Sequence, residues 1–327
     1  MPRLRVYLTQ PVALSAIERL KKVADLTLNS DPLHIVTKAE LLKAAREHDI
    51  IFCLLHDKID AEIINANPNL RAIASMTITP ADIDVQAATA RQLPVTVIPA
   101  PLLNDATADL AFALLLATVR RVAEGDRVMR SGVFPGSQSN YLESGTVSRK
   151  TLGLIGLGGV GTAMAQRARG FSMRVIYHDP KRLTPDKEHE LNATWVPFEQ
   201  IFSDADFVSL HVQLTPQTRH LIGAPQLASM KPTAYIINSA RGPVIDELAL
   251  VQALKEKRIA GAGLDVFENE PRPHVDLLAM NNVVCTPHMG SAAGELREAM
   301  ANVVVNNILA LLEGKRAPNC WNAEIYN

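Results

Sequence analysis

The chain has 327 residues, a length that fits about two domains of ordinary size. Hydrophobic residues make up 47% of it and charged residues 20%, which is typical of folded proteins and argues against a disordered chain or a multi-span membrane protein. The 33 basic and 34 acidic residues nearly balance, so the chain lacks the excess positive charge that non-specific nucleic-acid binding requires.

The cysteines and the apolar runs exclude several further classes. Cys53, Cys285 and Cys320 are far apart and form no CxxC pair, so neither a disulfide framework nor a zinc knuckle is indicated. The longest apolar run, residues 110–119, is well short of the ~20 residues that a membrane span needs. We expect a cytoplasmic protein with no metal site and with no nucleic-acid or membrane partner.

The first hundred residues alternate short apolar runs with amphipathic stretches. The runs predict strands at 4–8, 26–28, 50–55, 70–75 and 95–98. The stretches between them predict helices, among them 13–23, 38–47 and 61–66. Such an alternation is typical of a mostly parallel sheet with helices on both faces.

This rhythm breaks at Pro94, Pro99 and Pro101, and a long Ala/Leu-rich helix is predicted at 106–129, followed by a loop at 132–149. A second series predicts six strands at 151–155, 174–177, 207–212, 234–238, 260–266 and 283–285. A last helix at 295–313 ends at Gly314, and we expect it to return to the first domain. The predicted substrate-binding domain is therefore 1–101 plus 291–327, and the predicted dinucleotide-binding domain is 102–290.

A glycine-rich turn opens the second series. The run from Gly156 to Gly161 is a GxGxxG that follows a predicted strand and precedes a predicted helix, and Asp179 lies 18 residues beyond it. Gly156 permits the tight turn, Gly158 lets backbone amides approach a pyrophosphate, and Gly161 lets the helix pack closely on the sheet. Gly159 and Val160 complete the turn. Asp179 favours NAD over NADP, but Lys181 and Arg182 just downstream leave NADP open.

Three polar residues follow three later strands. Arg241, Glu270 and His288 come after the runs that end near residues 240, 267 and 287. Ligands of open parallel sheets bind outside the carboxyl ends of the strands. An arginine there can bind a carboxylate, and a histidine beside a carboxylate can transfer a hydroxyl proton. Singly, each could instead be a cap, an exposed acid or a packed histidine, but together they favour hydride transfer to a 2-keto acid.

These segments together resemble the D-isomer-specific 2-hydroxyacid dehydrogenases over nearly the whole chain. The resemblance rests on the glycine turn, Asn238-Ser239-Ala240-Arg241-Gly242, Gly263-Leu264-Asp265-Val266-Phe267 with Glu270-Pro271, and Thr286-Pro287-His288. It implies a Rossmann-type dinucleotide-binding domain inserted into a discontinuous flavodoxin-like substrate domain. It also implies a homodimer built largely through the long helix near 106–129.

The resemblance also implies roles for single residues. Arg241, Glu270 and His288 would form a catalytic triad, Asp265 would lie near the nicotinamide carboxamide, and further residues would line the cofactor, namely Val212, Gln213, Ser239 and Ala240. The substrate carboxylate would meet the loop at 76–82 through Ile78 and Thr79, together with Arg241 and His288. Thr79 stands where the family commonly has glycine, Gln213 where it prefers proline, and Gly159 where arginine is common.

The implied activity is interconversion of a 2-keto acid and a D-2-hydroxy acid, with glyoxylate, hydroxypyruvate or a sugar acid as substrate. One alternative is a dinucleotide-sensing scaffold of the corepressor kind, which could retain the same triad. Another is a phosphite dehydrogenase, whose relatives keep the same three residue types. Formate dehydrogenases pair their histidine with glutamine, so Glu270 argues against formate oxidation.

Overall fold

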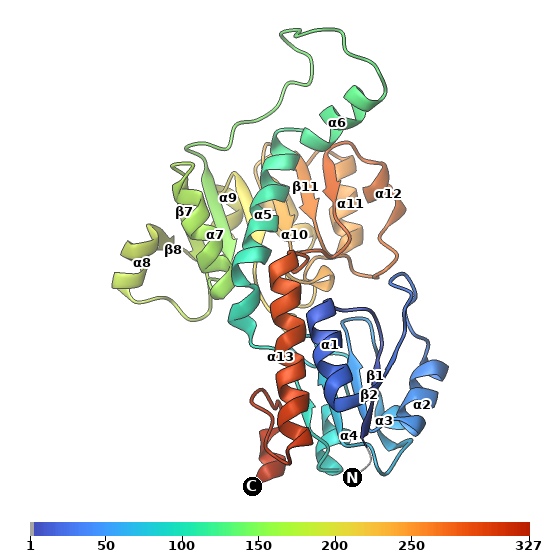
Figure 1. Ribbon diagram of the computed structural model, residues 1–327. Coiled ribbons are helices and arrows are strands. Elements are labelled where there is room, and N and C mark those ends of the chain that lie inside the picture. The colour runs from blue at the N-terminus through green and yellow to red at the C-terminus, as the bar shows by residue number, and fades with distance from the viewer. Residues whose placement is uncertain (1–2) are drawn as a thin grey trace. The chain divides into compact units, whose positions relative to one another are not determined.

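The computed structural model describes residues 3–327 and divides into two compact units (Figure 1). The first unit is built from residues 3–102 together with Ala292–Asn327, and the second is Leu103–Ser291. Each unit has its own parallel sheet, so the chain leaves the first sheet once and comes back to it after the second is complete.

The first unit contains a five-stranded sheet in the order β2-β1-β3-β4-β5, which is the flavodoxin-like order. The four strand pairs of this sheet are all parallel. Its strands are β1 (Leu4–Leu8), β2 (Ala24–Leu28), β3 (Ile50–Cys53), β4 (Ala72–Ser75) and β5 (Val95–Thr96). Its helices are α1 (Leu14–Val23), α2 (Lys38–Glu47), α3 (Ala61–Asn65), α4 (Val85–Ala90) and α13 (Gly294–Leu312).

The last helix, α13, packs along α1 in this unit. The hydroxyl of Ser15 donates to Glu298 at 2.7 Å, and the guanidinium of Arg19 donates to Asn302 and Asn306. Buried Val304 and Ile308 lie on the same helix. The C-terminal part of the chain is therefore a structural layer of the first unit.

The second unit contains a seven-stranded sheet in the order β12-β11-β10-β9-β6-β7-β8, a Rossmann order with one added edge strand. Its strands are β6 (Thr151–Ile155), β7 (Arg174–His178), β8 (Ala193–Trp195), β9 (Phe207–Leu210), β10 (Tyr235–Asn238), β11 (Gly261–Leu264) and β12 (Val283–Cys285). Its helices are α5 (Asn104–Val119), α6 (Val122–Arg130), α7 (Gly159–Arg169), α8 (Pro185–Leu191), α9 (Phe198–Asp204), α10 (Ala224–Ser229), α11 (Glu247–Lys255) and α12 (Val275–Ala279). The predicted fold class is confirmed.

Two features of the second unit differ from the sequence prediction. The long helix expected at 106–129 is two helices, because Arg121 adopts a left-handed backbone with φ of 53° and its guanidinium pairs with Glu124. Strand β8 was not predicted, since three residues are too few for a clear apolar pattern. It lies at the sheet edge beside β7.

The segment Ala100–Val119 is long and apolar enough to cross a membrane by composition alone. In the structure its helical part, α5, packs on α7 and on strands β10 and β11. Seven of its side chains, including Phe112 and Leu115, are buried there. It is a core helix of the second unit.

Candidate active site

The three polar residues predicted at strand ends lie on three adjacent strands. Arg241 follows β10, Glu270 follows β11 and His288 follows β12, and β11 pairs with both of the others. Since all three strands run parallel, their carboxyl ends meet at one edge of the sheet. The fold thus brings to one edge residues that are up to 47 positions apart in the sequence, from 241 to 288.

Glu270 and His288 are in direct contact. The Nδ1 of His288 donates to the Oε2 of Glu270 at 2.8 Å, and the Oε1 of Glu270 accepts the backbone N–H of Phe267 at 3.1 Å. Each side chain is 21% exposed. The carboxylate fixes the proton on Nδ1, which leaves Nε2 as the atom that can exchange a proton with a ligand.

The turn that carries His288 is held by Asp265. One oxygen of this buried carboxylate accepts the Thr286 hydroxyl at 2.6 Å and the Met289 N–H at 2.8 Å, and the other accepts the Gly290 N–H at 2.8 Å. The backbone N–H of His288 donates to the Asp265 carbonyl at 2.8 Å. Burial raises the pKa of Asp265, and the Thr286 hydrogen bond opposes that rise.

Arg241 is brought to the same edge by a close backbone approach. A Cβ on the next residue, Gly242, would lie 1.8 Å from the carbonyl oxygen of Phe267, so only glycine fits there. The side chain of Asn238 donates to the Arg241 carbonyl at 3.0 Å, and the Arg241 guanidinium donates to the Ala240 carbonyl at 2.7 Å. The turns after β10 and β11 are thus packed backbone to backbone.

The glycine turn has the geometry of a phosphate cradle. Gly156 has φ of 90°, and a Cβ on it would meet the His211 carbonyl at 2.8 Å. A Cβ on Gly161 would lie 2.3 Å from the Gly156 oxygen, whereas one on Gly158 would meet nothing within 4 Å. Helix α7 begins at Gly159, within the glycine turn itself, so the exposed turn leads directly into a helix N-terminus. This fits a dinucleotide pyrophosphate.

Asp179 lies beside that turn. Its Oδ2 accepts the Leu157 N–H at 3.0 Å and its Oδ1 accepts the Lys181 N–H at 2.9 Å. The guanidinium of Arg182 donates two hydrogen bonds of 2.9 Å to the Glu188 carboxylate, and its Cζ lies 5.9 Å from the centroid of the Trp195 ring. An acidic group therefore stands at the position expected to meet the adenosine ribose, and the nearby arginine is neutralised.

Two buried polar atoms stand at the ends of β9 and β10. The Nδ1 of His211 and the Oγ of Ser239 accept or donate no hydrogen bond within residues 3–327. These residues directly follow Leu210 and Asn238, which are partners in the sheet register. Ala240 and the pair Val212 and Gln213 lie next to them in the chain. Orphaned polar groups at this edge fit a site that a bound group completes.

The predicted substrate loop belongs to the first unit. It follows β4, and its backbone is held by a chain of hydroxyls, in which Ser75 contacts Thr77 at 2.6 Å and Thr77 donates to the Thr79 carbonyl at 2.8 Å. Ile78 and Thr79 are half-buried, and Pro80 is buried. No group of three or more metal-binding side chains occurs in the described part of the chain.

Sequence reasoning missed the residues that hold these catalytic candidates. Asp265 was expected to contact the cofactor, yet it also holds the His288 turn, and Glu247 was not singled out although it accepts two backbone hydrogen bonds near Glu270. The sequence offered only a weak signal for Glu247, an acidic residue four positions after Pro243 and before an apolar stretch. Its partners, Glu268 and His274, are 21 and 27 residues away.

Comparisons with known proteins agree with this geometry. Residues 112–290 match the family model of the D-isomer specific 2-hydroxyacid dehydrogenase, NAD binding domain. A glyoxylate reductase of Thermococcus litoralis is 43% identical, over 98% of this chain and 97% of its own length. The solved structure of the TT0316 protein from Thermus thermophilus has a TM-score of 0.89 at 40% identity, and covers 97% of this chain and 100% of that one. A glyoxylate reductase from Paecilomyes thermophila has a TM-score of 0.83 at 30% identity, with 99% and 100% covered.

Proposed function

Because the chain belongs to the D-isomer-specific 2-hydroxyacid dehydrogenase family, we propose that it reduces glyoxylate or a similarly small 2-keto acid with hydride from NADH. The oxidoreductase class and the NAD-binding domain follow from the family. The choice of a small keto acid is supported by the full-length similarity to glyoxylate reductases. That similarity favours an enzyme over a dinucleotide-sensing scaffold. We expect it to work in the cytoplasm.

The observation that carries the proposal is the 2.8 Å bond between His288 and Glu270 at the strand edge that also bears Arg241. When bound, the dinucleotide supplies the hydride. The Nε2 of His288 gives a proton to the substrate oxygen, and Glu270 stabilises the positive charge on the ring. The Arg241 guanidinium binds the substrate carboxylate and offsets the negative charge that develops on the oxygen.

The test is His288→Ala assayed with a panel of 2-keto acids, with NADH oxidation followed by absorbance. We expect a rate loss on the order of 10² to 10⁴ on every substrate, because the variant has no group that can give the proton. The Kd for NADH, measured separately by fluorescence titration, should stay within about threefold of the wild-type value, because His288 is not part of the glycine turn.

A wild-type protein that binds NADH and turns over no keto acid would contradict the proposal. Including phosphite with NAD in the panel tests the other enzyme class. Turnover of phosphite alone would replace the keto-acid assignment.

We also propose that the enzyme is a homodimer formed through the α5–α6 region and the loop that follows it. Helix α5 is rich in apolar residues, and it packs on α7 and on strands β10 and β11 while Leu110 and Leu116 stay only half-buried. Beyond it, four large apolar side chains are more than half exposed: Val122, Met129, Val133 and Phe134. Exposed apolar side chains gathered in one region are typical of a protein–protein interface.

A further inference from the structure

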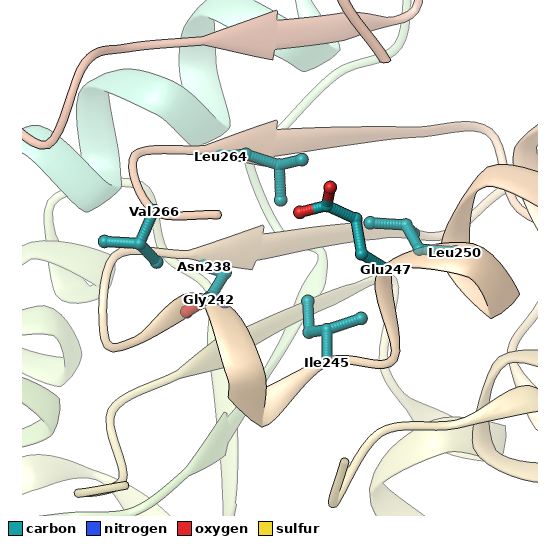
Figure 2. Close-up of a pocket in the computed structure, with 7 residues that line it drawn as sticks. All are labelled: Asn238, Gly242, Ile245, Glu247, Leu250, Leu264 and Val266. Atoms are coloured by element: carbon teal, nitrogen blue, oxygen red, sulfur yellow. The ribbon is translucent and has the colours of Figure 1, made fainter. Parts of the chain in front are cut away.

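A small cavity lies where β10 and β11 end, beside the residues that follow them. It is lined by Asn238, Gly242, Ile245, Glu247, Leu250, Leu264 and Val266. Figure 2 shows the Glu247 carboxylate pointing among the aliphatic side chains of Leu250 and Leu264. Glu247 is the one acidic residue in this lining, and it is buried. A carboxylate in such surroundings is costly unless hydrogen bonds compensate it.

Those hydrogen bonds come from the two ends of one loop. The Oε2 of Glu247 accepts the backbone N–H of Glu268 at 2.9 Å, and its Oε1 accepts the backbone N–H of His274 at 2.9 Å. The loop between these amides, 268–274, has Glu270 near its middle. One carboxylate at the start of α11 therefore fixes both ends of the loop that carries the partner of His288.

The loop also forms a hydrogen bond of its own to the start of α11. The Oε2 of Glu268 accepts the backbone N–H of Glu247 at 3.3 Å, and its Oε1 accepts the ring Nε2 of His220 at 2.6 Å. Arg219 lies 3.4 Å from the same oxygen. The Arg219 guanidinium and the His220 ring therefore face Glu268, whereas Glu247 accepts two backbone amides.

The position of Glu270 is sensitive to this anchoring. Its two oxygens accept from Phe267 and His288 at 3.1 and 2.8 Å, and a hydrogen bond weakens steeply once the atoms separate beyond about 3.5 Å. A shift of the loop of roughly 1 Å would break the bond to the His288 ring, and misplacement of that size can cost about 10²-fold in rate.

We propose that Glu247 is a positioning residue, whose carboxylate holds the loop 268–274 so that Glu270 stays bonded to His288. The proposal rests on the proposed function, because it assigns to Glu247 an effect exerted through the acid/base pair. The position of Glu270 against His288 would then depend on a residue that lies 23 positions earlier in the sequence.

The test is Glu247→Gln, which keeps the size of the side chain but replaces one acceptor oxygen with an NH₂ group. That group would face a backbone N–H, donor against donor. We expect kcat for keto-acid reduction to fall by about tenfold to a hundredfold and NADH affinity to stay within about threefold. The alkaline limb of the kcat profile should move to lower pH, the direction expected for Glu270→Gln, because a displaced carboxylate stabilises the protonated ring less. The carboxylates facing the His288 turn are Glu270 and Asp265.

The double variant Glu247→Gln/Glu270→Gln separates positioning from general damage. If Glu247 acts through Glu270, the double variant should be no slower than Glu270→Gln alone, since the two changes then remove the same interaction. The proposal would be overturned if the kcat losses of the two single variants multiply in the double variant, or if the pH profile of Glu247→Gln does not move. Glu247→Asp, which keeps both acceptor oxygens, should recover part of the rate.

Two controls keep this outcome distinct from failure of the proposed function. Glu256 lies at the exposed C-terminal end of α11, where its side chain accepts from Gln252 and Arg258, so the kcat of Glu256→Gln should equal that of the wild type. If His288→Ala and Glu270→Gln keep full activity, the proposed function fails. If they lose activity while Glu247→Gln keeps its rate, only the positioning role fails.

Discussion

His288, the proposed proton donor, has an uncommon backbone conformation. Its φ is 51°, in the left-handed region that residues with a Cβ rarely adopt. The surrounding hydrogen bonds enforce it, because Asp265 accepts from Thr286, Met289 and Gly290 on either side. Strained residues held in this way cluster at functional sites. The ring is thus aimed by its backbone as well as by Glu270.

A second histidine yields a prediction on stability. The ring of His211 has a buried Nδ1, and burial lowers the pKa of this group to about 4, below its ordinary value of 6.5. The folded state therefore binds fewer protons than the unfolded state between those values, so this group costs stability as pH falls from 6.5 toward 4. The loss between pH 7.5 and pH 5 should be about 2 kcal/mol.

His211→Gln removes this titration. We measure the free energy of unfolding with urea at pH 7.5 and at pH 5. We expect the decrease between these two pH values to be smaller in His211→Gln than in the wild type, by about 2 kcal/mol. The exposed His189→Gln is the matched control and should behave as the wild type does. If all three proteins lose the same unfolding free energy between pH 7.5 and pH 5, the His211 ring binds its proton as readily in the folded state as in the unfolded state.

At the scale of single elements, the segment from β7 through α8 holds the residues that we predict to set the choice between NAD and NADP. Arg182 donates twice to Glu188 on α8, and the Tyr177 hydroxyl donates to the same carboxylate at 2.8 Å. The Arg182 bond is the main cause of the lowered pKa of Glu188. An arginine engaged in this way is less available to bind the 2′-phosphate of NADP, and we expect the Asp179 carboxylate to repel that phosphate.

Glu188→Gln should release Arg182 and improve the use of NADPH. We expect KM for NADPH to fall by about threefold to tenfold, which corresponds to about 0.7–1.4 kcal/mol, because the released guanidinium gains a charge-assisted contact to the 2′-phosphate. The kcat and KM for NADH should change little. Steady-state kinetics with both cofactors check this. Glu190→Gln on the same helix, which loses only a pairing to Lys187, is the control. A ratio of the two KM values that stays fixed in Glu188→Gln would assign the preference to Asp179 alone.

The elements show where sequence reasoning reached its limit. Apolar runs predicted the central strands well, since strands such as β3 and β9 are buried at every position. The break at Arg121 was not visible, because Val119 to Val122 contains neither glycine nor proline. The residues at strand ends were predictable because parallel strands end at a common edge. Contacts such as Glu247 with His274 were not, since they join loops whose approach depends on the whole sheet.

At the scale of the whole molecule, the proposed dimer can be tested by disrupting its apolar surface. The variant Met129→Glu/Phe134→Glu places two charges on side chains that are 57% and 66% exposed, so the folded protomer should tolerate them. We expect light scattering to give the mass of a dimer, twice 35.6 kDa, for the wild type and a monomer for the variant. Leu33→Glu, an exposed site in the first unit, should leave the dimer intact.

A wild-type protein that is monomeric at micromolar concentration would contradict the dimer. A dimer that persists in the double variant would move the interface to another surface.

The order of the two units along the chain has a practical consequence. Arg241, Glu270, His288 and the glycine turn all lie within Leu103–Ser291, one uninterrupted piece of chain. The loop proposed to meet the substrate lies outside it, in the stretch that precedes Leu103. Chimeras with a relative therefore need only two splice points, near 102 and 292, to exchange the proposed substrate loop while leaving the proposed proton-transfer residues untouched. Recombination at those two points is a simple route by which such a chain could diversify its substrates.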